Sequence, residues 1–67
     1  MQDDPLYVEI TRDMKPGDPS ITVKDATARW KRSDSHTRRV LDWMTHLEKP
    51  PTMTEVPGSQ PKAWERI

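Results

Sequence analysis

The stretch ITVKDATARWKRSDSHTRRVLDWMTHL, from Ile21 to Leu47, decides which fold we expect for this chain. Its apolar residues recur at helical spacing in two segments, about 23–30 and about 34–48, which we predict to be helices. The polar run between them, Lys31 to Ser35, is short enough to form a tight turn. We therefore take these two helices as the centre of the fold and work outward from them.

Polar residues mark the start of both predicted helices. Thr22 is a good N-cap, and Asp25 three residues later completes something close to a capping box. Ser33 or Asp34 can cap the next helix, because either side chain can accept hydrogen bonds from amides that a helix leaves free. The boundaries of this pair of helices therefore have local chemical causes.

The second helix is predicted to have two different faces. Its apolar stripe, which we expect to face the core, contains Thr37, Val40, Leu41, Met44 and Leu47. The opposite face and its flanks carry Ser35, His36, Arg38, Arg39, Asp42 and His46. Trp43 falls at the edge of the stripe, where it can close the core against a first helix or a hairpin. In the helix before the turn, we expect Trp30 in the core, in preference to stacking on a nucleic-acid base.

Upstream, the sequence predicts a supporting helix over about residues 5–15. Asp4-Pro5 is a favourable start, since the carboxylate can cap free amides and proline suits the first helical position. The apolar residues repeat every four positions, and Pro16-Gly17 should end the helix. A strand is the alternative for residues 6–11, LYVEIT, which are rich in β-forming residues.

Downstream, the sequence predicts a hairpin over about residues 53–67. Lys49-Pro50-Pro51 should end the preceding helix sharply. Residues 53–56 and 62–67 are candidate strands, and the loop PGSQP between them has strong turn chemistry. The chain therefore reads as one α+β domain of three helices followed by a two-stranded unit.

The composition limits the class of protein. The chain has 67 residues, of which 31% are hydrophobic and 33% charged, and it has no cysteine, so disulfides and thiolate metal sites are excluded. No apolar run approaches the roughly 20 residues needed to cross a bilayer. The acidic N-terminus does not resemble a secretory signal, and we expect a cytoplasmic protein without membrane contact.

Charge is distributed unevenly although the net charge is zero. Residues 1–18 carry five acidic and two basic side chains, whereas residues 24–39 carry six basic and two acidic ones. A basic cluster on one structural unit is the electrostatic pattern typical of nucleic-acid binding. The alternative is an ordinary solvated surface, which is common in small domains.

Motifs for catalysis and for metal binding are missing. His36 and His46 are ten residues apart, with no carboxylate at ligand spacing. Ser33, Ser35 and His36 are too close in sequence to form a nucleophile–base pair, and no GxSxG, Walker or GxGxxG pattern occurs. We therefore expect neither an enzyme nor a bound metal or cofactor.

The whole pattern resembles that of small bacterial, archaeal and phage winged helix-turn-helix regulators. The order of helix, short strand, helix, tight turn, helix and hairpin is the same, and the resemblance covers about residues 5–67. Matching positions of their thr-val-x-asp-leu-ala … ser-x-x-thr-val-arg-arg-x-leu-x-x-leu pattern are Val23, Asp25, Ser33, Thr37, Arg38, Arg39, Leu41 and Met44. The closing KAWERI is similar to a last wing strand. The chain departs from the pattern at Ala26 and Thr27, and Lys31-Arg32 stand where the turn often has glycine.

The resemblance implies sequence-specific binding of double-stranded DNA. Ser35, His36, Arg38 and Arg39 would face the major groove, where arginine can bind guanine bidentately. Lys31, Arg32 and the amide end of the helix beginning at Ser33 would hold backbone phosphates. Ser59, Gln60 and Lys62 of the wing would reach the minor groove or a phosphate. A homodimer is also expected, because two half-sites are usual for so small a reader, although no dimerisation helix is evident.

Three hypotheses follow for the function. The first is a transcriptional regulator or recombination-accessory protein of phage or plasmid type. The second is a winged-helix protein–protein adaptor or inhibitor that docks on a replication or transcription complex, which the zero net charge favours. The third is a small mixed fold with LYVEIT in a sheet.

Overall fold

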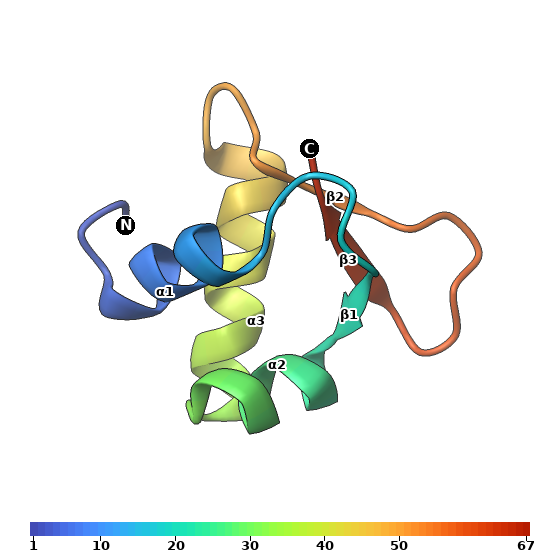
Figure 1. The fold of residues 1–67 in the computed structure, drawn as a ribbon, viewed down its shortest axis with the longest axis horizontal. Helices are drawn as coiled ribbons and strands as arrows, with labels where there is room; N and C mark the ends of the chain where they lie inside the picture. The colour runs from blue at the N-terminus through green and yellow to red at the C-terminus, as the bar shows by residue number, and fades with distance from the viewer.

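The structure, a computed structural model, describes all of residues 1–67 as an α+β fold. In Figure 1, α3 stands behind α1, α2 lies across the lower end of α3, and the sheet lies on the other side of α2 and α3 from the N-terminus. The elements in chain order are α1 (Pro5–Asp13), β1 (Ile21–Thr22), α2 (Val23–Trp30), α3 (Asp34–Asp42), the π-helical turn η1 (Trp43–Leu47), β2 (Met53–Glu55) and β3 (Ala63–Arg66).

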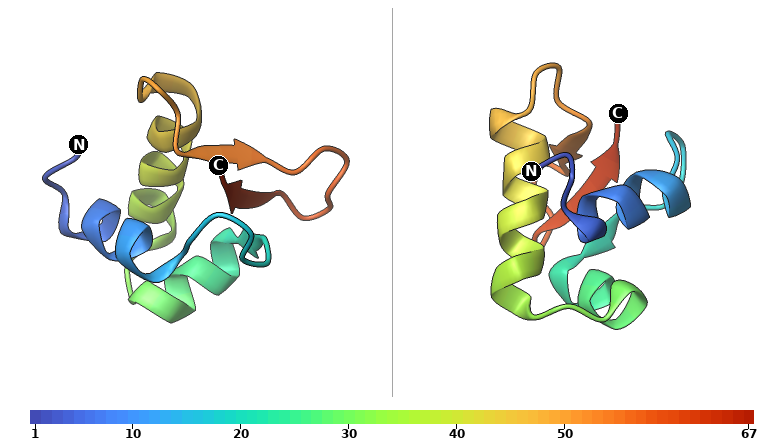
Figure 2. Two further views of the ribbon diagram at one scale, coloured as in Figure 1. Left: turned by 45° about the horizontal axis from the view of Figure 1, so that its top comes forward. Right: turned by 90° about the vertical axis from the view of Figure 1, so that its left-hand side faces the viewer.

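The sheet has three antiparallel strands in the order β1-β3-β2, one strand more than the predicted two-stranded wing. The short extended piece before α2 pairs with β3, with Ile21 opposite Trp64 and Thr22 opposite Ala63. Extended backbone leaves N–H and C=O groups that need partners, and the open edge of β3 supplies them. This added strand connects the wing directly to the start of α2, as the two views of Figure 2 show.

Helix α1 confirms the helical prediction and rules out a strand over residues 6–11. The Asp4 side chain accepts a hydrogen bond from the Leu6 amide at 2.8 Å, and Pro5 occupies the first helical position. The helix ends at Asp13, two residues before the predicted end. Leu6 and Ile10 are fully buried, and burial of this stripe outweighs the β propensity of the segment.

Both predicted caps of the central helices are present. Thr22 and Asp25 form a capping box at α2, and the Ser33 hydroxyl accepts the His36 amide hydrogen bond at α3. At the end of α2, Lys31 adopts the left-handed conformation with φ 56°, the position where glycine is favoured. The turn therefore has the expected geometry, but with a residue that adopts it less easily.

The helix predicted over 34–48 changes character at Trp43. The α-helix ends at Asp42, and Trp43–Leu47 forms a π-helical turn in which the Glu48 amide donates to the Trp43 carbonyl at 2.8 Å. This turn takes one more residue than an α-helical turn, so later side chains are rotated relative to the stripe. Leu47 is consequently 67% exposed, and its predicted place in the core is wrong.

Glu48, instead, is buried at the end of this turn. Its carboxylate accepts hydrogen bonds from the side chains of Tyr7, Thr52 and Gln2. Burial by itself raises the pKa of Glu48, but the three hydrogen bonds outweigh it and hold the pKa below its usual value. Glu48 is therefore charged at neutral pH. Its hydrogen bonds connect the end of η1 with α1 and with the segment before β2.

One hydrophobic core lies between the helices and the sheet. It includes both Trp30 and Trp64, at 4% and 2% exposure, so the prediction for Trp30 is confirmed. Trp43 is half-buried and packs edge-on against Tyr7 of α1, with ring centroids 5.8 Å apart. The largest fully buried side chains come from α1, α3, η1, β2 and β3, so every layer contributes to the core. None of the helices combines the length and the apolar character that crossing a membrane requires.

Candidate functional site

Two of the predicted DNA-binding residues, Arg32 and His36, are held by α1. The Arg32 guanidinium donates to the Glu9 carboxylate at 2.7 Å and also to the Trp30 carbonyl. His36 Nε2 lies 2.9 Å from the Asp4 carboxylate, and the hydrogen bond between them is the main reason why the pKa of Asp4 is lowered. About a quarter to a third of the Arg32 and His36 side chains is exposed. Their contacts with Glu9 and Asp4 join α1 to the start of α3 and to the turn before it.

The outward side of α3 carries the other predicted contacts. Ser35, Arg38 and Arg39 are all exposed on it. Arg38 lies one turn after Asp34, with 3.9 Å between guanidinium nitrogen and carboxylate oxygen, and its side chain is 61% exposed. Arg39 forms no ion pair. The structure thus brings three of the ten predicted side chains together on one solvent-facing surface.

The turn residues Lys31 and Ser33 lie at the lower end of the same helix pair. Lys31 is exposed and forms no ion pair, so its ammonium group is free to meet a phosphate. Ser33 uses its hydroxyl oxygen to cap α3 and keeps its hydroxyl hydrogen for another partner. Both positions therefore remain compatible with backbone contacts.

The wing supplies Gln60 and Lys62, whereas Ser59 is used within the loop. The Ser59 hydroxyl donates to the Pro61 carbonyl at 2.8 Å. Gln60 is exposed, and the Lys62 ammonium lies 3.7 Å from the Glu55 carboxylate with its side chain 66% exposed. A lysine this exposed can exchange one partner for another at small cost.

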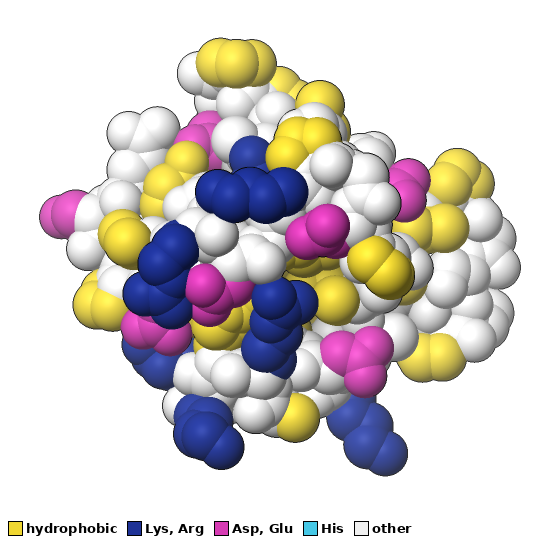
Figure 3. All heavy atoms as spheres, in the orientation of Figure 1, with side chains coloured by type: hydrophobic (Ala, Val, Ile, Leu, Met, Phe, Trp, Pro, Cys, Tyr) yellow, Lys and Arg dark blue, Asp and Glu magenta, His cyan; other side chains and the backbone are white.

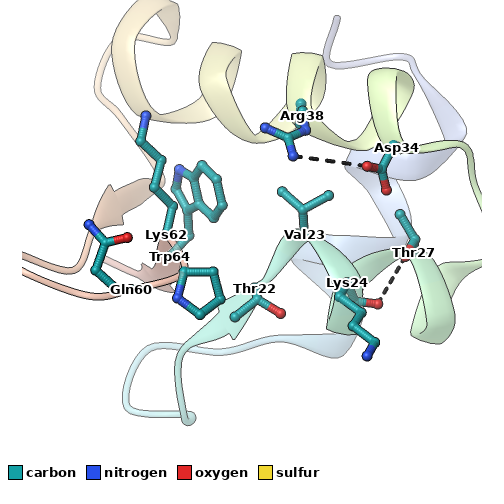
Figure 4. A pocket seen from close by; sticks show the side chains of 10 residues that line it. Thr22, Val23, Lys24, Thr27, Asp34, Arg38, Gln60, Lys62 and Trp64 are labelled. Carbon is teal, nitrogen blue, oxygen red and sulfur yellow. Dashed lines mark hydrogen bonds and ion pairs between the residues drawn. The ribbon is translucent and has the colours of Figure 1, made fainter.

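A cleft of about 600 Å³ lies where α2, α3 and the wing loop meet. Figure 4 shows Arg38 on one side of it, Gln60 and Lys62 on the other, and Lys24 at the start of α2. Polar side chains predominate among its ten lining residues. The cleft therefore joins the outward side of α3 to the wing through one cationic surface.

Among the cleft residues that the sequence prediction did not include are Lys24 and Trp64, which both carry hydrogen-bond donors. Lys24 was counted in the basic segment, but its position became meaningful only when β1 placed the start of α2 beside the wing. Trp64 was visible in the closing KAWERI as an aromatic strand residue. Its place in the cleft depends on pairing with β1 on one side and β2 on the other.

The face of the molecule that carries α1 is electrostatically different. In Figure 3, which views the molecule from this side, basic side chains are interleaved with acidic ones. Arg12 pairs with Asp13 at 2.7 Å, as Arg32 does with Glu9. Two hydrogen bonds to the Asp13 carboxylate lower its pKa strongly. The larger effect comes from the Arg12 guanidinium and the smaller from the Trp30 indole N–H. Cations on this face are therefore balanced by neighbouring carboxylates.

The chain places no group of three or more histidine, cysteine, aspartate or glutamate side chains where they could hold a metal ion. The groups that the site does offer are hydrogen-bond donors and positive charges, on α2, α3 and the wing. The comparisons with known proteins add no relative: no family model, curated protein or solved structure matches the chain.

Proposed function

We propose that this chain binds double-stranded DNA as a small winged-helix protein, with a sequence-specific role in transcription regulation or recombination. Helix α3 would enter the major groove, and the loop between β2 and β3 would lie on the adjacent groove or backbone. The order of helices and strands is the first support, because it is the order of a winged helix. The third strand, β1, is compatible with that order.

The observation that carries the proposal is the pair of adjacent arginines on the outward side of α3. Arg38 and Arg39 are exposed, while Val40 and Leu41 on the other side of the same helix are fully buried. The helix is therefore backed by the core and presents two guanidinium groups to solvent. Each can form a bidentate contact with guanine, which discriminates by about 1–3 kcal/mol, or can pair with a phosphate.

The wing and the start of α2 add cations around these arginines. Lys62 and Gln60 lie across the cleft from Arg38, and Lys24 lies at the near end of α2 (Figure 4). Contacts of lysine with phosphate supply affinity without base information, so these residues would orient α3 in the groove. Arg32 and His36 are left out of this contact set, because holding α1 is the role that their present bonds support.

A salt titration with wild-type protein and short duplexes tests the proposal. Affinity should fall steeply with salt, with a logarithmic slope of about −0.9 for each phosphate neutralised. Arg38→Ala combined with Arg39→Ala should abolish retention of duplex while leaving the melting temperature nearly unchanged. A large drop in melting temperature would show that these arginines are structural.

A matched control removes the same charge from the other side of the molecule. Arg12→Ala combined with Lys15→Ala also takes away two positive charges, at exposed positions in and just after α1. This variant should bind duplex within about threefold of wild type, since remote exposed charges act only through a screened field. Equal losses in the two double variants would contradict a specific contact surface on α3.

A protein–protein adaptor is the second candidate function. It is favoured by the internal carboxylates close to Arg38 and Lys62, by the zero net charge, and by Leu47, which is 67% exposed near the end of the same outward side. An adaptor should fail to bind duplex even at low salt, and its affinity for a protein partner should depend on Leu47.

A further inference from the structure

The indole nitrogen of Trp64 is a buried hydrogen-bond donor without a partner. Trp64 is 2% exposed, and its Nε1 contacts no acceptor in the protein. Buried donors are nearly always hydrogen-bonded, and a buried tryptophan usually finds an acceptor for its N–H. Trp30 shows the ordinary arrangement, since its Nε1 donates to the Asp13 carboxylate at 3.0 Å. Trp64 is therefore the exception among the buried indoles.

Trp64 also lines the cleft between α2, α3 and the wing. In Figure 4 the edge of its ring that carries the nitrogen lies beside the stem of Lys62. Glu55 is directly opposite Trp64 in the sheet, and the Lys62 ammonium is held 3.7 Å from its carboxylate. Movement of this exposed side chain away from Glu55 would open the approach to the indole N–H.

The groups around this nitrogen determine which kind of ligand the cleft can bind. The indole, the Arg38 guanidinium and the ammonium groups of Lys24 and Lys62 are donors with no acceptor capacity. The first turn of α2, an eight-residue helix, also lines the cleft and adds a partial positive charge. Asp34 is the one carboxylate in the lining, and Arg38 already lies 3.9 Å from it. A ligand made of acceptors and carrying negative charge fits this set.

We infer that the cleft between α2, α3 and the wing holds one phosphate group, bound by Trp64 Nε1, Arg38 and Lys62. Where the phosphate belongs to duplex DNA, the inference rests on the proposed function. The chemistry is the same for a free phosphate, which the experiment separates from the duplex. Glu55 holds Lys62 while the site is empty, so binding exchanges a carboxylate for a phosphate at the same ammonium group.

The indole N–H resonance in a ¹H–¹⁵N spectrum of the whole chain reports on this hydrogen bond. Wild-type protein is titrated separately with inorganic phosphate and with a short duplex, against chloride at matched ionic strength. The Trp64 resonance, assigned by its absence in Trp64→Phe, should move downfield in both titrations and not with chloride. The Trp30 resonance should stay in place, because that donor already has an acceptor.

Binding measurements on two variants test the same contact by affinity. Trp64→Phe keeps an aromatic side chain but removes the pyrrole ring with its N–H donor, and should weaken duplex binding on the order of tenfold, as expected for a lost hydrogen bond to a charged group. No hydrogen bond within the protein is lost, but the smaller ring leaves a cavity in the core. Affinities are therefore compared at a temperature where a thermal melt shows that the variant is folded. Trp30→Phe changes the other buried indole, which lies outside the cleft, and is the matched control; the folded variant should bind as wild type. Glu55→Gln should bind several-fold more tightly, because Lys62 is released.

The outcomes separate this inference from the proposed function. Duplex binding with an unmoved Trp64 resonance and an unaffected Trp64→Phe variant would overturn the phosphate site and leave DNA binding intact. A Trp64 shift with inorganic phosphate but no binding of duplex would support the site and overturn the proposed function. No response to either ligand would overturn both.

Discussion

Basic residues of α3 and of the turn just before it serve two different purposes, depending on the side of the helix that they face. On the inner side, Arg32 and His36 lie against carboxylates of α1, at 2.7 and 2.9 Å. On the outer side, Arg38 is only loosely paired and Arg39 has no ion pair. The four residues lie within eight positions of the sequence, so spacing along the chain does not separate them. Their partners separate them. A basic side chain that is paired with a carboxylate of α1 positions the helices, whereas an unpaired one is available to bind a ligand.

The acidic first segment explains this division. Asp4 caps α1 and faces His36, while Glu9 one turn later faces Arg32. The acidic charge of residues 1–18 is therefore partly used to hold α3, and it does not simply oppose the basic segment. In consequence a zero net charge coexists with exposed cations on the outward side of α3, where the ion pairs of Arg38 and Lys62 are longer, at 3.9 and 3.7 Å.

The largest effect is expected in the core, from Trp30→Ala at the end of α2. This substitution removes a core side chain that is 4% exposed and also its hydrogen bond to Asp13. The loss should be about 3–5 kcal/mol, enough to unfold a domain whose net stability is on the order of a few kcal/mol. Circular dichroism during heating measures it, and survival of a cooperative melt would show that Trp30 does not anchor the fold.

Arg32→Ala should have an intermediate effect and sharpens the comparison most directly. It removes the ion pair with Glu9 and the bond to the Trp30 carbonyl, and should lower the free energy of unfolding by about 1–2 kcal/mol. Duplex affinity should change little once the variant is folded. Arg39→Ala is the counterpart, with reduced duplex affinity and an unchanged melt. If both variants lost affinity and kept full stability, the two sides of α3 would not differ as described.

The smallest effect concerns pH and the contact between Asp4 and His36. Since the hydrogen bond to His36 lowers the pKa of Asp4 from 3.8 in the folded state, this carboxylate stabilises the fold above that value. The stabilisation is lost as the pH falls through the lower folded pKa. The melting temperature should therefore drop between about pH 5 and pH 2.

Asp4→Asn isolates this contribution. Asparagine still caps a helix, so α1 should persist, but the charged partner of His36 is gone. The variant should melt below wild type near pH 5, and the difference should shrink toward pH 2 as Asp4 becomes protonated. Glu48, whose pKa is also lowered, is present in both proteins and cancels in the comparison. A constant difference at all pH values would rule out the ionic contribution.

Local chemistry made the helix boundaries predictable. Asp4 at α1, Thr22 with Asp25 at α2 and Ser33 at α3 all cap as expected, because capping involves residues within three positions of each other. The exposure of Leu47 and the burial of Glu48 were not predictable in this way. The π-helical turn that exchanges them accompanies hydrogen bonds that Tyr7 and Gln2, more than 40 positions away, donate to the Glu48 carboxylate.

In the candidate site, too, some features follow from local sequence and others from tertiary packing. Arg38 and Arg39 were placed on the outward face by helical periodicity, a property of the segment itself. The contacts of Arg32 and His36 with α1 depend on how two helices pack, and the cleft with Lys24, Lys62 and Trp64 depends on the pairing of β1 with β3. The sequence by itself determined where each helix starts and which face of α3 is basic, because short-range hydrogen bonds and periodicity set both. Only the tertiary structure decided which cations are free, since that depends on carboxylates brought close from distant parts of the chain.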